Sequence, residues 1–276
     1  MLKKLNRGFI YLYLIITVLI VIYPIVYLVS SAFTPGRVLA NMPLIPFTGG
    51  FTLEHFITLF TNTNYPIWFR NTLIIAVGTS ASTVLVCTMA AYTFSRFKFT
   101  LKKSLMLMFL VLQIFPSMLG MVAIFVVMLR IGGIDTLWGL VLFYVAGNVP
   151  FNTWLVKSYM DNIPRSLDEA ARIDGASSFR IFRTVIFPQT KPIISFLALT
   201  TFVAPWMDFI IPSLILRSAE NRTLALGLLG FVQVRQRQEF TLFAAGALLV
   251  AVPFIIYFII MQKSLITSLG SGGVKE

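Results

Sequence analysis

Long apolar runs, separated by short polar stretches, dominate this chain and define its expected elements. Each run has 21 to 26 residues. At 1.5 Å per residue, a helix of that length crosses a hydrocarbon core of about 30 Å. Lipid offers the backbone no hydrogen bonds, so the spans must be helical. The pattern predicts an all-α integral membrane protein, one transmembrane domain over residues 1–276, with six spans at residues 8–33, 72–95, 104–129, 136–156, 193–216 and 240–262.

Composition supports this interpretation. The chain is 58% hydrophobic and only 12% charged, whereas soluble domains carry about 25% charged residues. The first run follows Lys3, Lys4 and Arg7, as a signal peptide would, but its apolar part exceeds the roughly 7 to 15 residues of a cleaved signal. We therefore expect a retained first span. The single Cys87 excludes an intrachain disulfide.

The net charge of +12 raises the alternative of a nucleic-acid partner. Its distribution argues against one. With both termini inside, the inner segments hold 15 of the 22 Lys and Arg residues and the outer segments hold 7. That bias is typical of cytoplasmic loops. We expect both termini in the cytoplasm and no bound nucleic acid.

The stretch 157–192, between the fourth and fifth spans, is the largest expected cytoplasmic feature. Ser166 and Glu169 have the spacing of a capping box, directly after Pro164. Asp168 and Glu169 suit the first helical turn, and Asp168 can pair with Arg172 at i,i+4. Gly175 has the position of a helix C-terminus. These signals predict a short helix over residues 166–176.

A second amphipathic helix is expected directly after it. Ser177 or Ser178 can cap this helix, and Phe179, Phe182 and Ile186 share one of its faces. Pro188 and Pro192 are expected to separate it from the fifth span. The stretch is either a connector lying on the lipid headgroups or a docking site for a partner.

The chain shows no energy source of its own. It contains no G-x-x-x-x-G-K-[ST] sequence, so we expect no ATP, Mg²⁺ or other cofactor on this chain. His55 has no His or Cys cluster around it, and no nucleophile–base or paired-carboxylate pattern appears, so neither a metal site nor a catalytic site is expected. The hypothesis is that an ATP-hydrolysing partner docks on residues 166–178.

Asp208 is the single ionisable residue within the expected spans. It is a candidate for a substrate pathway through the membrane, where it would accept hydrogen bonds from a polar substrate with Trp206 as a stacking platform. The other interpretation is a carboxylate that reaches outer water or pairs with Arg217 or a partner subunit. A third use, ion coupling, would make the chain a self-sufficient secondary carrier. A scaffold without transport is a further alternative.

The sequence "EAARIDGASSFRIFRTVIFP" resembles the EAA loop of binding-protein-dependent ABC importer permeases, E-A-A-x3-G-x9-I-x-L-P. Glu169, Ala170, Ala171, Gly175 and Pro188 match it in place, while Val185 and Phe187 replace Ile and Leu. The stretches "AAYTFSRFKF" (90–99), "PFNTWLVKSY" (150–159) and "IPRSLDEAARIDGAS" (163–177), with the ending "GGVKE", are similar to carbohydrate-type permeases. The likeness is strongest to the six-span subunit of maltose and maltodextrin importers, and it covers essentially the whole chain.

The resemblance implies a transport subunit rather than an enzyme, located in a bacterial or archaeal cell membrane and surrounded by lipid. It implies a second permease subunit, a dimeric ATPase subunit that binds ATP and Mg²⁺, and an external solute-binding protein. The solute would be a malto-oligosaccharide or similar oligosaccharide, or else another sugar or a polyol. The helix at 166–176 would be the coupling helix, which contacts the ATPase through Asp168, Glu169, Ala170, Ala171, Arg172 and Gly175. The outer loop 217–240 would reach the binding protein.

Overall fold

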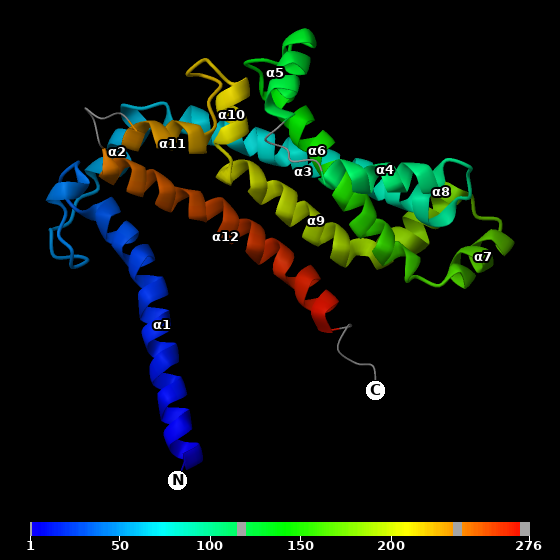
Figure 1. Cartoon of the computed structure of the whole chain (residues 1–276), viewed down its shortest axis with the longest axis horizontal. Coiled ribbons are helices and arrows are strands. Elements are labelled where there is room, and N and C mark those ends of the chain that lie inside the picture. The colour runs from blue at the N-terminus through cyan, green and yellow to red at the C-terminus, as the bar shows by residue number, and fades with distance from the viewer. Residues whose placement is uncertain (1, 115–119, 234–238, 271–276) are drawn as a thin grey trace. The chain divides into compact units, whose positions relative to one another are not determined.

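The computed structural model describes residues 2–114, 120–233 and 239–270, and the elements in these ranges are helices (Figure 1). Two compact units form: residues 1–66 with 226–252, and residues 67–225 with 253–276. The helices are α1 (Leu2–Phe33), α2 (Glu54–Thr61), α3 (Tyr65–Arg96), α4 (Lys102–Ile114), α5 (Met121–Arg130), α6 (Leu137–Asp161), α7 (Arg165–Ile173), α8 (Ser178–Ile181), α9 (Phe187–Met207), α10 (Ile210–Ile215), α11 (Leu224–Gln233) and α12 (Phe240–Gly270), with a 3₁₀ turn at Leu39–Asn41 and a π turn at Phe182–Ile186.

The first unit joins the segment after α1 to the start of α12. His55 of α2 is buried, and its Nε2 lies 2.9 Å from the carbonyl oxygen of Thr34. Thr241 Oγ1 donates to the Gly36 carbonyl, and Tyr65 Oη donates to the Gly246 carbonyl. A side chain at Gly246 would collide with Leu228. The elements of this unit are therefore held by hydrogen bonds and close helix packing.

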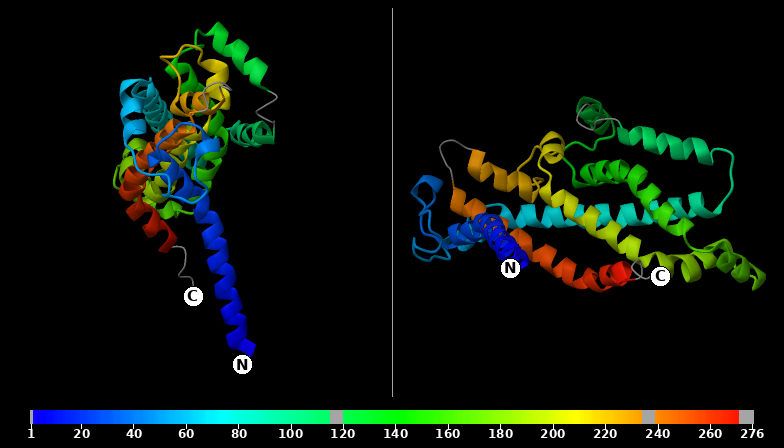
Figure 2. Two further views of the ribbon diagram at one scale, coloured as in Figure 1. Left: turned by 90° about the vertical axis from the view of Figure 1, so that its left-hand side faces the viewer. Right: turned by 60° about the horizontal axis from the view of Figure 1, so that its bottom comes forward.

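The second unit is built on α3, α6 and α9: α6 packs against α9, and α3 contacts both (Figure 2). Ser80 Oγ of α3 donates to the Ala198 carbonyl of α9. One apolar core joins the three helices to the segment after α6, through Cys87, Ala91, Val156, Met160, Ile163, Ile181, Ile186 and Leu197. Figure 1 shows α7 at one end of this bundle.

The end of the bundle far from α7 is fastened by a loop at residues 216–224. Asp135 Oδ1 accepts hydrogen bonds from the backbone N–H groups of Arg217 and Ser218. Asn71 Nδ2 donates to the carbonyls of Glu220 and Arg222. Asp135 has a φ of 58°, in the left-handed region that Asp and Asn tolerate better than most residues. The loop is therefore fixed to both α3 and the turn before α6.

Within the described residues, five helices are long and apolar enough to cross a membrane: Gly8–Phe33, Tyr65–Arg96, Leu137–Asp161, Ser178–Met207 and Phe240–Ile260. The chain is thus all-helical with several potential spans. The expected third span, 104–129, corresponds to α4 and α5, with residues 115–119 between them outside the described residues. The expected second span is longer than predicted, since α3 begins at Tyr65.

The fifth span differs from the prediction of 193–216. Helix α9 begins at Phe187 and ends at Met207, and α10 follows after a break at Asp208 and Phe209. Pro188 and Pro192 do not separate the amphipathic segment from the span. Pro188 lies in the first turn of α9, directly after the π turn, and Pro192 lies inside α9. The π turn immediately before it changes the hydrogen-bond spacing, and Gln189 Nε2 donates to the Val185 carbonyl. Helical backbone therefore continues from Ser178 to Met207.

Candidate functional site

Helix α7 occupies the expected position of the short cytoplasmic helix, but it begins differently. Pro164 is the N-cap residue, and the helix runs from Arg165 to Ile173 without a side-chain cap. The predicted capping box of Ser166 and Glu169 is therefore wrong. With Pro164 at the N-cap, Ser166 is already inside the first turn and cannot serve as the cap residue. The fixed φ of Pro164, −55°, orients the chain for helix entry instead.

The C-terminus of α7 forms a Schellman motif around Gly175, the predicted end of the helix. Gly175 has a φ of +78°, which a glycine adopts without a steric penalty. Its N–H donates to the Arg172 carbonyl, and the Ala176 N–H donates to the Ala171 carbonyl. These two bonds satisfy carbonyls that the helix end leaves free. The next helix is capped by Ser177, whose Oγ accepts from the Arg180 N–H.

The two faces of α7 differ sharply in exposure. Asp168 is 7% exposed, and Ala171 packs on the apolar core of the second unit. On the other side, Glu169, Ala170 and Arg172 are exposed. Ile173 is 87% exposed, as an apolar side chain at the end of an otherwise polar helix. This exposed face, with a carboxylate, a small residue and a large apolar group, is available for contact with another protein.

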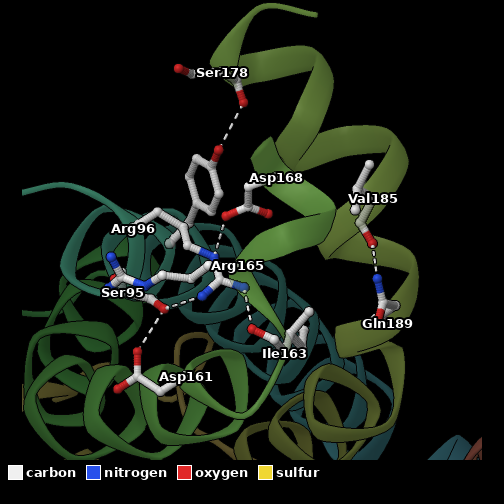
Figure 3. Close-up of polar contacts among 10 residues, drawn as sticks. Ser95, Arg96, Asp161, Ile163, Arg165, Asp168, Ser178, Val185 and Gln189 are labelled. Carbon is white, nitrogen blue, oxygen red and sulfur yellow. Dashed lines mark hydrogen bonds and ion pairs between the residues drawn. The ribbon is translucent and has the colours of Figure 1, made fainter. Parts of the chain in front are cut away.

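Asp168 pairs with Arg96 rather than with Arg172, which corrects the predicted i,i+4 pair. Arg96 is the last residue of α3, and its Nε lies 2.7 Å from Asp168 Oδ2 (Figure 3). The side chains of Arg96 and Asp168 are 2% and 11% exposed. Burial explains the choice of partner, because a carboxylate taken out of water needs an equally buried cation. Arg172 points to solvent and cannot supply one.

Further hydrogen bonds surround this ion pair. Arg96 Nη2 donates to the Ile163 carbonyl at 2.9 Å, and Arg165 Nη2 donates to the Ser95 carbonyl at 3.1 Å. Ser95 Oγ donates to Asp161 Oδ1, at the end of α6. Tyr92 Oη, one turn earlier in α3, donates to the Ser178 carbonyl at 2.9 Å. We call Tyr92, Ser95, Arg96, Asp161, Arg165 and Asp168 the α3–α7 cluster.

Two residues of this site were missed from sequence alone. Arg96 belongs to the inner positive charges that indicate the orientation of the chain, and nothing local in the sequence indicates its partner. Ile173 lies between Arg172 and Asp174, and a single apolar residue in a polar stretch gives no signal of exposure. The amphipathic pattern of a helix as short as α7 does not fix which residues face the protein.

Trp206 and Asp208, the pathway candidates, lie at the end of α9. Trp206 is 3% exposed and packs against the rings of Phe69, Phe202 and Phe254. Within the described chain it therefore presents no open ring face to a sugar. Asp208 Oδ1 accepts from the N–H groups of Ile210 and Ile211, and Oδ2 accepts from Tyr144 Oη. Asp208, one residue before the N-cap residue Phe209, thus caps the first two N–H groups of α10 with its side chain and is bonded to α6, rather than to Arg217.

Comparison with known proteins connects these features to a family. Residues 83–264 match the binding-protein-dependent transport system inner membrane component. The maltodextrin transport system permease protein MdxG of Bacillus subtilis is 40% identical, over 99% of this chain and 98% of that protein. The galactooligosaccharides transport system permease protein GanQ of Bacillus subtilis is also 40% identical, over 99% and 97%. The maltose/maltodextrin permease MalG of Salmonella typhimurium is 31% identical, over 99% and 97%.

Solved structures show a similar fold. A chain of a bacterial ABC transporter that imports the acidic polysaccharide alginate superposes with a TM-score of 0.80 at 20% identity, covering 95% of this chain and 96% of that one. The family match includes α6, α7 and the part of α3 from residue 83 onward, and therefore every residue of the α3–α7 cluster. The full-length relatives are named as permeases, and the described helices include several apolar enough to span a membrane. The chain therefore belongs to the family of binding-protein-dependent transport system inner membrane components, as a multi-pass membrane permease.

Proposed function

We propose that this chain is one of two permease subunits of an ATP-driven oligosaccharide importer, with α7 as the helix that couples it to the ATPase. Six spans would place both termini and α7 in the cytoplasm of a bacterial or archaeal cell. The second permease subunit would complete the translocation pathway. An external binding protein would deliver the solute to the opposite face, at the loop 217–240.

The observation that carries the proposal is the two-faced structure of α7. One face is attached to the bundle through Asp168 and Ala171, and the other exposes Glu169, Ala170 and Ile173. A helix that only lay on lipid headgroups would have no need of a buried ion pair beneath it. A small residue between a carboxylate and an apolar group lets a partner surface approach closely. The partner we propose is an ATPase subunit that binds ATP and Mg²⁺.

The relatives support the solute class. Their names include maltodextrin and galactooligosaccharide transport, and a structural neighbour is an alginate importer in complex with a periplasmic protein bound to alginate pentasaccharide. We propose an oligosaccharide as solute, with maltodextrins first and another sugar or polyol as the alternative. The external binding protein of the proposed complex also follows that precedent.

The proposal is tested by purifying the tagged chain from its native membrane. We expect an ATPase subunit to co-purify with the wild type. Glu169→Lys and Ile173→Glu should each lower the amount retained by about tenfold or more, as central interface residues do. Glu220→Lys is the matched control, because it makes the same charge reversal at the other end of the bundle. Normal retention of the ATPase by Glu169→Lys and Ile173→Glu would refute the docking role of α7.

The secondary-carrier alternative gains no support from Asp208. Both of its oxygens already accept hydrogen bonds within the chain. A proton-coupled carrier would lose uptake when the proton gradient is collapsed, whereas the proposed importer needs ATP. Uptake of maltotriose into vesicles with and without ATP, and with and without an uncoupler, separates these two mechanisms.

A further inference from the structure

Helix α7 has chain connections to α6 and α8 but not to α3. The linkers are short, residues 162–164 before α7 and 174–177 after it. Displacement of α7 is therefore passed directly to α6, and through α8 to α9. Helix α3 is remote in sequence, so any displacement of α7 must reach α3 through side chains. The α3–α7 cluster provides that contact.

Arg96 holds α7 at two points. Its Nη2 donates to the Ile163 carbonyl, in the linker before α7, and its Nε pairs with Asp168 in the first turn of α7. The planar guanidinium makes both contacts from a fixed fork geometry, which a lysine ammonium cannot reproduce. Arg165 and Tyr92 add one hydrogen bond each, to the Ser95 and Ser178 carbonyls.

The ion pair is the contact that resists separation most strongly. Asp168 Oδ1 is buried and has no hydrogen-bond partner in the described chain, so the charge of Arg96 is the principal compensation for this carboxylate. Separating the pair would leave two charges buried without compensation, which is costly. Arg96 also lies at the C-terminus of α3 and Asp168 near the N-terminus of α7, where the helix dipoles favour their charges. Movement of α7 should therefore carry the end of α3 with it.

We propose that Arg96 is a positioning residue that transmits the movement of α7 to α3 during the ATP cycle. This inference rests on the proposed function, since it assumes that an ATPase moves α7. It assigns Arg96 a role separate from docking, because its side chain is buried and faces away from the exposed surface of α7.

The test uses the intact complex purified through a tag on this chain, with a fluorophore on one introduced cysteine. Asp174→Cys reports on the end of α7, and Lys98→Cys reports on the chain just after α3; both positions are exposed, and the native Cys87 is buried. Emission is recorded before and after addition of Mg·ATP with vanadate. Each labelled chain is also prepared with Arg96→Gln, with Arg96→Lys, and with the control Lys103→Ala. The control removes an exposed positive charge from the first turn of α4, close in sequence to Lys98.

With Arg96 in place, we expect both labels to respond. In Arg96→Gln the label at position 174 should still respond, while the response at position 98 should fall by about tenfold. Arg96→Lys should restore part of it, and Lys103→Ala should leave it unchanged. A full response at position 98 in Arg96→Gln would overturn the inference. So would loss of the response at position 174 in Arg96→Gln, since Arg96 would then be needed for docking or folding.

The proposed function fails in a different way. If no ATPase co-purifies with the wild type and neither label responds, the assumption of an ATPase on α7 is wrong. If the wild type responds at position 174 but not at position 98, the ATPase assignment stands and the role of Arg96 is wrong.

Discussion

Tyr144 of α6 donates a hydrogen bond of 2.8 Å to Asp208, the residue at which the helix of the fifth span breaks. Asp208 also caps the six-residue helix α10 through the N–H groups of Ile210 and Ile211. The carboxylate thereby connects the end of α9, the start of α10 and the N-terminal part of α6. This arrangement fixes the backbone at the break between α9 and α10. Substitutions of Asp208 should therefore distinguish a structural role of its carboxylate from a role in substrate binding.

For Asp208, we expect Asp208→Ala to lower the free energy of unfolding by about 1 to 2 kcal/mol, through loss of the cap. Asp208→Asn keeps a side-chain oxygen for the N–H groups and should lose less. Thermal unfolding of the purified chain in detergent measures both variants. If Asp208→Asn abolished ATP-dependent uptake while unfolding as the wild type does, the carboxylate would have a function in the pathway beyond capping.

Gly175 should be sensitive to any side chain, although space is available. A Cβ there would meet nothing within 4 Å, but the φ of +78° disfavours L-residues. We expect Gly175→Ala to cost about 1 kcal/mol and Gly175→Asn less, because Asn tolerates this region. Gly175→Pro should be worst, since proline requires a negative φ and removes the N–H bonded to Arg172. Proteolysis rates within residues 165–178 report the order, and equal rates in all three variants would contradict it.

Two glycines of α6 provide a matched comparison. A Cβ at Gly139 would collide with the backbone carbonyl of Gly133, in the tight turn before α6, whereas one at Gly147 would meet nothing within 4 Å. We expect Gly139→Ala to destabilise the chain by about 1 to 3 kcal/mol through backbone displacement. Gly147→Ala should be neutral or slightly stabilising, because alanine favours the helix. Unfolding midpoints in detergent measure both, and equal midpoints would mean that the turn yields easily.

Acid should weaken the attachment of the 216–224 loop. Burial raises the pKa of Asp135. Hydrogen bonds from the backbone N–H groups of Arg217 and Ser218 and from the Ser218 hydroxyl together lower this pKa by more than burial raises it, so the pKa is below its ordinary value of 3.8. A carboxyl with a lowered folded-state pKa stabilises the fold above its unfolded pKa, and that contribution is lost as pH falls through the folded pKa. The loss is therefore expected below about pH 4.

Asp135→Asn isolates this effect, since asparagine also tolerates the φ of 58°. The wild type should unfold at a higher temperature than the variant at pH 7, and the difference should shrink below about pH 4. Comparison within the pair cancels the titration of other carboxyls. A difference that stays constant down to pH 3 would show that the charge of Asp135 is not what fastens the loop.

The long apolar runs made most of the fold predictable. Helices α1, α3, α6 and α12 overlap the expected spans, because a run longer than 20 apolar residues has few other structures available in lipid. The fifth span begins earlier than the predicted residue 193, because Pro188 and Pro192 do not separate it from the preceding helical segment. Instead, Pro188 lies in the first turn of α9 and Pro192 lies inside it, and the π turn directly before α9 cannot be inferred from spacing alone.

The site was predictable only where its signals are local. Gly175 follows a polar helical stretch directly, so its position at the helix end could be inferred from neighbours. The partner of Asp168 could not, because Arg172 has the i,i+4 spacing of a helical ion pair, whereas Arg96 becomes near only after α3 and α6 pack together. Burial of the carboxylate, a property of the tertiary structure, decides between the two cations.

The exposure of Ile173 has a consequence for how cells must make this protein. A copy without the proposed ATPase subunit would present the apolar side chain of Ile173 on its surface, and Phe179, nearby in sequence, is 68% exposed. Exposed apolar patches are what chaperones and proteases recognise in incomplete assemblies. We therefore expect orphan copies to be short-lived and to gain lifetime when the ATPase subunit is made alongside them. Pulse-chase measurement with and without that subunit would detect the difference, and Ile173→Ser should lengthen the life of the orphan.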